Sequence, residues 1–198
     1  RGSSTRSSVP YVNLGTSLSY SAWIRPRLGG NAGDIIGVMD TLIRISPTDI
    51  KFYTDGTAGY LASIAFNFEN NKLYQLGVTC SGTTVKFYIN GTLLGTQTAS
   101  GAVDTSSTSN FIGYYGIAPQ AFEGEMAEVA AWSRTLTDAD MANIYFRNIV
   151  STTNLERYYK FATGSGTTAT DSSVNAQDGT ITAGAWVNGF FGNRSVVS

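Results

Sequence analysis

The sequence has 198 residues, of which 14% are charged, well below the share of about 25% in ordinary soluble domains. A net charge of -1 gives no attraction to nucleic acid, and the absence of histidine excludes Ser–His–Asp, Cys–His and histidine-ligated metal sites. We therefore expect no nucleic-acid partner. No apolar run approaches the length of a membrane-spanning helix, so we also expect no membrane insertion.

The beginning of the chain is polar and is followed by a long β-forming region. Residues 1–10 carry little apolar surface, which predicts a flexible N-terminal arm. Beyond them, short β-forming runs are broken by Gly, Asn, Asp and Ser, a pattern typical of all-β proteins. All-β sandwiches of this length are commonly one domain, so we expect a single domain over residues 11–198.

A three-strand meander is the clearest local pattern and covers residues 76–98. Within it, the apolar Val85, Phe87 and Ile89 occupy alternate positions, the period of a strand with one buried face. The dipeptide Asn90-Gly91 follows at once, and both residues tolerate the positive φ that a tight hairpin requires. This region therefore predicts two consecutive hairpins.

One short helix is predicted from about residue 137 to residue 147. Thr137 and Asp140 have the spacing of a capping box, and acidic residues occupy the first turn. Met141, Ile144 and Tyr145 then share one face. We expect this face to lie against a sheet.

Five segments occur in the order typical of a known family: residues 11–15, 18–26, 73–91, 122–132 and 134–137. They resemble the laminin-G-like, pentraxin-like branch of the concanavalin A-like lectin/glucanase superfamily. The resemblance implies a two-sheet antiparallel jelly-roll sandwich. Together with the alternation, it places Trp23, Phe87, Ile89 and Val129 in the shared core.

The C-terminal part, residues 158–198, resembles segments that usually stand at the start of such a domain. We interpret this as circular permutation, with these residues supplying the missing strands, or as donation of the same strands to a neighbouring subunit. If the fold is kept, the strand near residues 195–197 should lie close to residues 9–11.

Three glutamates, Glu123, Glu125 and Glu128, have nearly the spacing of the catalytic strand in the superfamily's glucanases. A retaining glycosidase needs two carboxyl groups about 5–5.5 Å apart. The same segment matches the non-catalytic branch, and the tryptophan-rich sugar cleft typical of glucanases is absent. We therefore predict that the protein is not an enzyme.

Members of the family commonly hold a structural calcium ion through acidic side chains and carbonyl groups. At three positions where they often carry acids, this chain has Asn13, Ala127 and the pair 162–163. We therefore expect no cofactor. If a calcium site is retained, Asp171 and Asp178 are the best remaining carboxylates.

Aromatic side chains beside polar groups are the candidates for sugar contact, because sugar rings stack on aromatic faces. Such residues are Tyr53, Asp55 and Tyr60 around one glycine-rich loop, and Tyr114 and Tyr115 in another. The alternative is that these tyrosines cap the core with their hydroxyl groups in water.

Three functions remain open from the sequence. The first is a non-catalytic carbohydrate-binding or adhesion module of a secreted, cell-surface or virion protein, with glycans or cell-surface polysaccharide as its partners. The second is a structural surface protein, such as a virion fibre, capsid decoration or filament subunit, that self-associates. The third, a glucanase-like hydrolase, is the least favoured.

Overall fold

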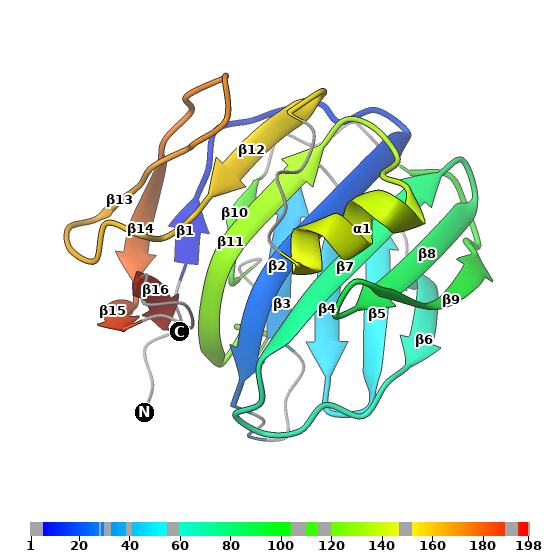
Figure 1. Ribbon diagram of the computed structural model, residues 1–198, viewed down its shortest axis with the longest axis horizontal. Helices are drawn as coiled ribbons and strands as arrows, with labels where there is room; N and C mark the ends of the chain where they lie inside the picture. The colour runs from blue at the N-terminus through cyan, green and yellow to red at the C-terminus, as the bar shows by residue number, and fades with distance from the viewer. Residues whose placement is uncertain are drawn as a thin grey trace.

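The computed structural model describes residues 6–27, 29, 33–38, 41–54, 60–103, 110–114, 120–146, 152–188 and 194–197. For Arg6, Val38, Thr54, Tyr60, Ala183, Asn188 and residues 194–197 it describes the backbone alone. Within this part of the chain the structure contains two antiparallel sheets and one helix (Figure 1). The all-β sandwich predicted from the sequence is confirmed.

Sheet A has eight strands in the order β13-β14-β1-β10-β3-β4-β5-β6. In chain order its members are β1 (Arg6–Ser8), β3 (Gly33–Val38), β4 (Thr41–Ser46), β5 (Asp49–Thr54), β6 (Tyr60–Ala65), β10 (Phe111–Ile112), β13 (Thr168–Ala169) and β14 (Gly179–Ala183). Short connections join β3 to β4 and β5 to β6 at one end of the sheet, because these neighbours are antiparallel.

Sheet B follows the order β15-β16-β11-β2-β7-β8-β9, and β12 also pairs with β11. In chain order its members are β2 (Ser17–Pro26), β7 (Tyr74–Ser81), β8 (Thr84–Ile89), β9 (Thr92–Thr98), β11 (Gly124–Trp132), β12 (Leu155–Tyr159), β15 (Ala185–Asn188) and β16 (Arg194–Val197). The predicted meander is therefore formed by β7, β8 and β9.

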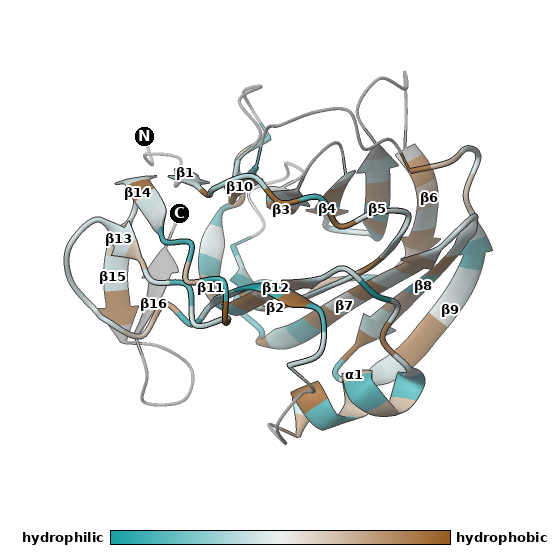
Figure 2. Cartoon of the chain, turned by 90° about the horizontal axis from the view of Figure 1, so that it is seen from above, coloured by the Kyte–Doolittle hydropathy of each residue, from teal (hydrophilic) through white to brown (hydrophobic). Residues whose placement is uncertain are grey.

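The core lies between the two sheets, which face each other as two layers in Figure 2. Alternate residues of β2, from Leu18 to Ile24, point into it, as the period of two residues requires. Phe87 and Val129 are fully buried there, and Ile89 packs against the core while partly exposed. These three predicted positions are correct.

Trp23 is the exception, because it lies on the outer face of sheet B. It alternates with Ala22 and Ile24, which point into the core, and its ring stacks on that of Tyr145 at 5.7 Å between centroids. Only 6% of Trp23 is exposed, so β2 is buried on both faces. In the sequence Trp23 is in phase with Ser19 and Ser21 and not with the apolar positions of β2, so its predicted place in the shared core is wrong.

The helix α1 (Asp138–Tyr145) covers that outer face, below sheet B in Figure 2. Its start is the predicted capping box, in which Thr137 and Asp140 each bond the other's backbone N–H. Met141 is fully buried over Gly77, where a Cβ atom would stand 2.7 Å from the methionine sulfur. The helix therefore sits directly on the backbone of β7.

Buried polar groups of sheet B bond to the segment before α1 and to the turn that contains Gly91. The Ser19 hydroxyl donates to the carbonyl of Arg134 at 2.8 Å and accepts from the N–H of Leu136 at 2.8 Å. The side chain of Gln75 donates to Ser21 and accepts from the N–H of Gly91. These hydrogen bonds fasten the segment before α1 and the turn at Gly91 to sheet B.

The beginning of the chain is more ordered than the predicted flexible arm. Strand β1 lies between β10 and β14, so residues 6–8 belong to sheet A, while residues 1–5 lie outside the described part. The buried Arg157 then donates from Nη2 to the carbonyl oxygens of Pro10 at 3.3 Å and Tyr11 at 2.8 Å. Backbone pairing and this side chain hold a segment with little apolar surface.

The C-terminal residues pair with strands of their own chain in both sheets. Strand β14 pairs with β1, whereas β16 pairs with β11 and β15 in the opposite sheet. The strand that pairs with the chain's beginning is therefore β14, whereas the segment near residues 195–197 pairs with β11 and β15. In the part of the chain that the structure describes, no helix is long and apolar enough to cross a membrane.

The single cysteine supplies a probe of this core. Burial raises the pKa of the Cys80 thiol to about 11, so roughly one thiol in a thousand is ionised at pH 8 in the folded protein. We expect a disulfide reagent such as DTNB to label Cys80 slowly without denaturant and rapidly in urea. Stoichiometric labelling within seconds under native conditions would show that β7 is not buried, and Cys80→Ala supplies the blank.

Truncation after Asn154 tests the contribution of the C-terminal strands. It removes β12 to β16, which leaves one edge of β11 unpaired and uncovers the core beside Tyr159 and Ile181. We expect insoluble or molten protein, seen as loss of near-ultraviolet circular dichroism and binding of the dye ANS. A monomeric truncated chain with sharp side-chain NMR signals would show that these strands are a separate appendage.

Candidate functional site

The outer face of sheet A carries a cluster of polar side chains around Arg44. Arg44 alternates along β4 with Ile43 and Ile45, which are core residues, so its side chain emerges on the opposite face. Strand register places Asp34 and Lys51 on either side of it. Figure 2 shows this face on the side of the molecule opposite α1.

Three neighbours hold the guanidinium group of Arg44. Its Nε donates to Oδ1 of Asp34 at 2.6 Å, its Nη2 donates to the side-chain oxygen of Gln120, and its Cζ lies 4.8 Å from the ring centroid of Tyr53. The Asp34 side chain is completely buried and that of Arg44 is 11% exposed. A buried charge is stable only when it is paired, so this cluster is fixed in place.

A second ion pair lies beside the first on the same face. Lys51 Nζ is 3.0 Å from Asp49 Oδ2, and both side chains are partly exposed. The hydroxyl of Ser46 donates to the same carboxylate at 2.6 Å. The described outer face therefore combines two ion pairs with the ring of Tyr53.

The predicted ligand residues do not all meet at this cluster. Tyr53 belongs to it, and the backbone of Tyr60 pairs with Tyr53 in the neighbouring strand. Asp55 and Tyr115 lie outside the described residues. Tyr114 is partly exposed and follows β10, which runs opposite to β3 and β5, so it lies at the other end of sheet A from Tyr53.

The ligand residues predicted from the sequence did not include Arg44, Asp34 or Gln120. A signal for Arg44 was present, because it is a lone charge between two isoleucines in a short β-forming run. Asp34 and Gln120 gave no such signal. Asp34 meets Arg44 through the pairing of β3 with β4, and Gln120 reaches Arg44 across 76 residues. Contacts of that range follow from topology and not from local pattern.

Asp171, a predicted metal ligand, is the centre of a tight loop. Its Oδ1 accepts from the N–H groups of Tyr158 and Ser173 at 2.8 and 2.9 Å, and its Oδ2 from the Ser173 hydroxyl and the N–H of Gln177 at 2.8 and 3.0 Å. Asp178 accepts from the N–H of Asp171 at 2.9 Å. Both carboxylates thus bind protein donors, and a calcium ion would compete with them. Among the described residues, no three His, Cys, Asp or Glu side chains cluster as a metal site would require.

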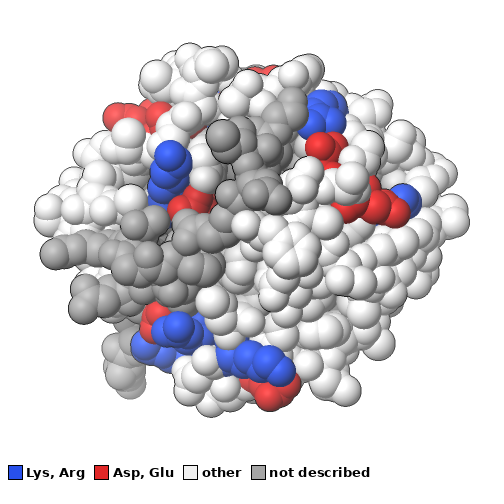
Figure 3. All heavy atoms as spheres, in the orientation of Figure 1, with Lys and Arg blue, Asp and Glu red and all other residues white. Residues whose placement is uncertain are grey.

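The three glutamates in and just before β11 do not form a carboxylate pair. Glu125 pairs with Arg25 at 2.9 Å and with Arg27 at 3.4 Å. Glu128 lies in a bulge at a φ of 52° and accepts from the hydroxyl of Tyr158, while Glu123 is exposed. The charged groups in view on the α1 side lie mostly beside groups of opposite sign on a neutral surface (Figure 3).

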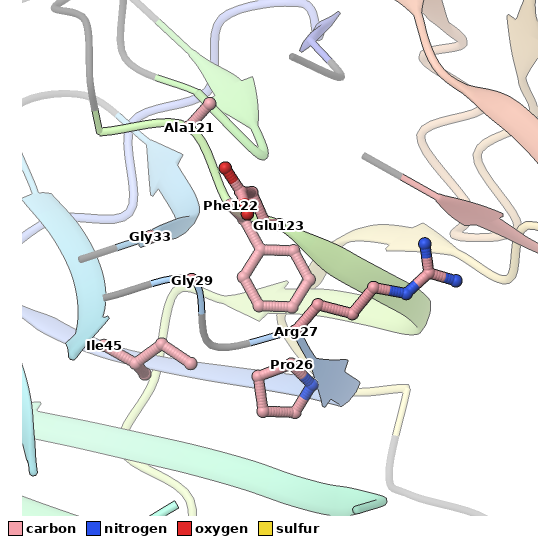
Figure 4. Close-up of a pocket in the computed structure, with 8 residues that line it drawn as sticks. All are labelled: Pro26, Arg27, Gly29, Gly33, Ile45, Ala121, Phe122 and Glu123. Carbon is pink, nitrogen blue, oxygen red and sulfur yellow. The ribbon is translucent and has the colours of Figure 1, made fainter. Parts of the chain in front are cut away.

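A small hollow lies near Glu123, at the ends of β2 and β11. Its lining comprises Pro26, Arg27, Gly29, Gly33, Ile45, Ala121, Phe122 and Glu123 (Figure 4). The ring of Phe122 points into the space between Pro26 and Ile45. The volume of about 10 Å³ suits a single water molecule and is far too small for a sugar ring.

Removal of the Asp171 carboxylate distinguishes a loop anchor from a metal ligand. Asp171→Ala deprives four donors of their acceptor, and we expect a loss of about 3 kcal/mol in the free energy of unfolding. The loss should be equal in calcium and in chelator, as measured by urea denaturation. Ser172→Ala, an exposed neighbour, is the control. A large rise in melting temperature with millimolar calcium that Asp171→Ala abolishes would instead establish a calcium site.

Comparison with solved structures shows the same fold in proteins of diverse origin. A candidate carbohydrate-binding protein from Bacteroides ovatus matches 91% of this chain and 56% of its own, at 20% identity and a TM-score of 0.73. The heptameric SAP-like pentraxin of Limulus polyphemus matches 75% of this chain and 85% of its own, at 15% identity and a TM-score of 0.55. Domain 4 of the extracellular arabinanase AbnA from Geobacillus stearothermophilus, in complex with arabinotriose, matches 66% of each chain at 19% identity and a TM-score of 0.54.

At these identities the solved structures show a shared fold alone. No curated protein sequence matches the chain. The family model described as the concanavalin A-like lectin/glucanases superfamily matches residues 1–142, which is most of the chain. The sandwich, the helix on one outer face and this match agree, and the chain belongs to the laminin-G-like group of the concanavalin A-like lectin/glucanase superfamily.

Proposed function

We propose that the protein is a non-catalytic carbohydrate-binding module whose ligand contacts Tyr53 on the outer face of sheet A. The observation that carries the proposal is the partly exposed ring of Tyr53, beside a buried arginine that bonds to Asp34 and Gln120. An extracellular or cell-surface setting belongs to the proposal, because polysaccharides are met there.

The chemistry of sugars matches this arrangement. The apolar C–H face of a sugar ring stacks on an aromatic face, while its hydroxyl groups need donors and acceptors at fixed positions. Arg44 is anchored by Asp34 and Gln120, so neither it nor the neighbouring Tyr53 ring has to be ordered when a ligand arrives. A rigid site of this kind loses little conformational entropy on binding.

Structural similarity supports the same class of function by analogy. The arabinanase domain was solved with arabinotriose, and the Bacteroides ovatus protein is a candidate carbohydrate-binding protein. Both share the fold at low identity, so the specific sugar and the position of the site rest on the argument from Tyr53 and Arg44.

Replacement of Tyr53 tests the site. We expect Tyr53→Ala to weaken binding of the best ligand on a glycan array by about tenfold, because the stacking surface is lost. Tyr11→Ala is the matched control, since Tyr11 is 44% exposed and makes no described ring contact. Isothermal titration of both variants gives the comparison. Equal affinities would show that the ligand does not contact Tyr53.

The hydrolase alternative is tested with the same ligand. We expect no release of reducing sugar, and Glu125→Gln should leave affinity unchanged because Glu125 pairs with two arginines on sheet B. Hydrolysis that Glu125→Gln abolishes would show that the protein is a glycosidase and not a non-catalytic binding module.

A further inference from the structure

Every cation whose side chain the structure describes on the outer face of sheet A is paired with a carboxylate. Arg44 is 2.6 Å from Asp34, and Lys51 is 3.0 Å from Asp49. The two pairs sum to zero charge. The remaining basic residue in the strands of this sheet is Arg6, which lies in β1, separated from β3 by β10, and its side chain is not described.

The sequence supplies no lysine or arginine in the three connections that join the strand ends nearest Tyr53. Three connections meet strands there, namely residues 39–40 between β3 and β4, residues 55–59 between β5 and β6, and residues 104–109 before β10. Together they contain Asp40, Asp55 and Asp104 and neither lysine nor arginine. No unpaired positive charge is therefore supplied from these connections.

The charge of a sugar decides what its site must contain. A uronate, sulfate or sialate group leaves water at a high cost unless a cation, commonly a bidentate arginine, replaces its hydration. Neutral sugars need only an aromatic face and partners for their hydroxyl groups. Arg44 has its Nε bound to Asp34, so it does not present an unshared positive charge.

We infer that the site selects neutral saccharides and rejects those that carry carboxylate or sulfate groups. This inference rests on the proposed carbohydrate-binding function and goes beyond it by naming the ligand class. The selectivity follows from the pairing of Lys51 and Arg44 within the sheet, so it can be changed by removing a partner.

The test compares sugars that differ in charge and little else. A glycan array with neutral and acidic oligosaccharides gives the first ranking. Titrations then compare lactose with lactose 3′-sulfate, and galactotriose with trigalacturonate, in chelator at 50 and 500 mM sodium chloride. We expect binding to be confined to neutral members and to change by less than about twofold with salt, since no net charge is neutralised.

A charge variant tests the same inference in the opposite direction, by giving the face an added positive charge. Asp49→Asn leaves Lys51 without that carboxylate, and we expect affinity for the acidic members to rise by about fivefold, as a single unscreened charge near the surface would give. Asp138→Asn is the matched control. It removes the partner of Lys86, 2.8 Å away, on the outer face of sheet B. This control should leave both sugar classes unchanged.

The outcomes separate the inference from the function on which it rests. Acidic members that bind as tightly as neutral ones, with affinity that falls as salt rises, would overturn the neutral selectivity and leave the binding module in place. An equal gain in Asp49→Asn and Asp138→Asn would also overturn it, because the effect would not belong to this face. A chain that binds no member of the array would overturn the proposed function itself.

Discussion

The central strands of sheet B are buried on both faces, and most of the architecture follows from that constraint. One face meets sheet A across the main core, and the other meets α1 through a second cluster around Trp132 and Met141. A sheet covered twice cannot present a ligand surface at its centre. The helix approaches the backbone closely because Gly77 and Gly91 leave room for Met141 and Tyr145. The surface available for recognition is thereby moved to the other sheet.

Sheet A uses polar residues in a different way. Beneath α1, hydroxyl and amide groups such as Ser19 and Gln75 bond to the backbone, so they fasten the covering segment to the sheet. On sheet A the buried polar group is an ion pair, and desolvating two charges costs more than a hydrophobic pair of similar size would. Its retention at Asp34 and Arg44 suits a role in positioning more than a role in stability.

The sequence predicted those features that depend on local pattern. The capping box at Thr137, the hairpin at Asn90-Gly91 and the burial of Phe87 follow from short-range chemistry, and the structure contains all three. Trp23 was assigned to the wrong face although it is in phase with Ser19 and Ser21, because its burial comes from Tyr145 of α1, which is far away in the sequence. The pairing of β1 with β14 was also hidden, since it joins residues more than 170 positions apart. At the site, Tyr53 was named, but its neighbours Asp34 and Gln120 reach it only through Arg44.

The pairing of β11 has a consequence for the order in which the chain emerges from a ribosome. One edge of β11 joins β2, which is made earlier, but the other edge joins β12 and β16, and these are made last. From Trp132 to Val197 the ribosome needs roughly 3–13 s at about 5–20 residues per second. The part of this edge that pairs with β12 waits only until Tyr159 is made, whereas Glu125 and Met126 wait for β16 and keep their backbone groups open to any other extended chain throughout that interval. The nascent protein therefore passes through a stage of seconds in which shielding by a chaperone is of most use.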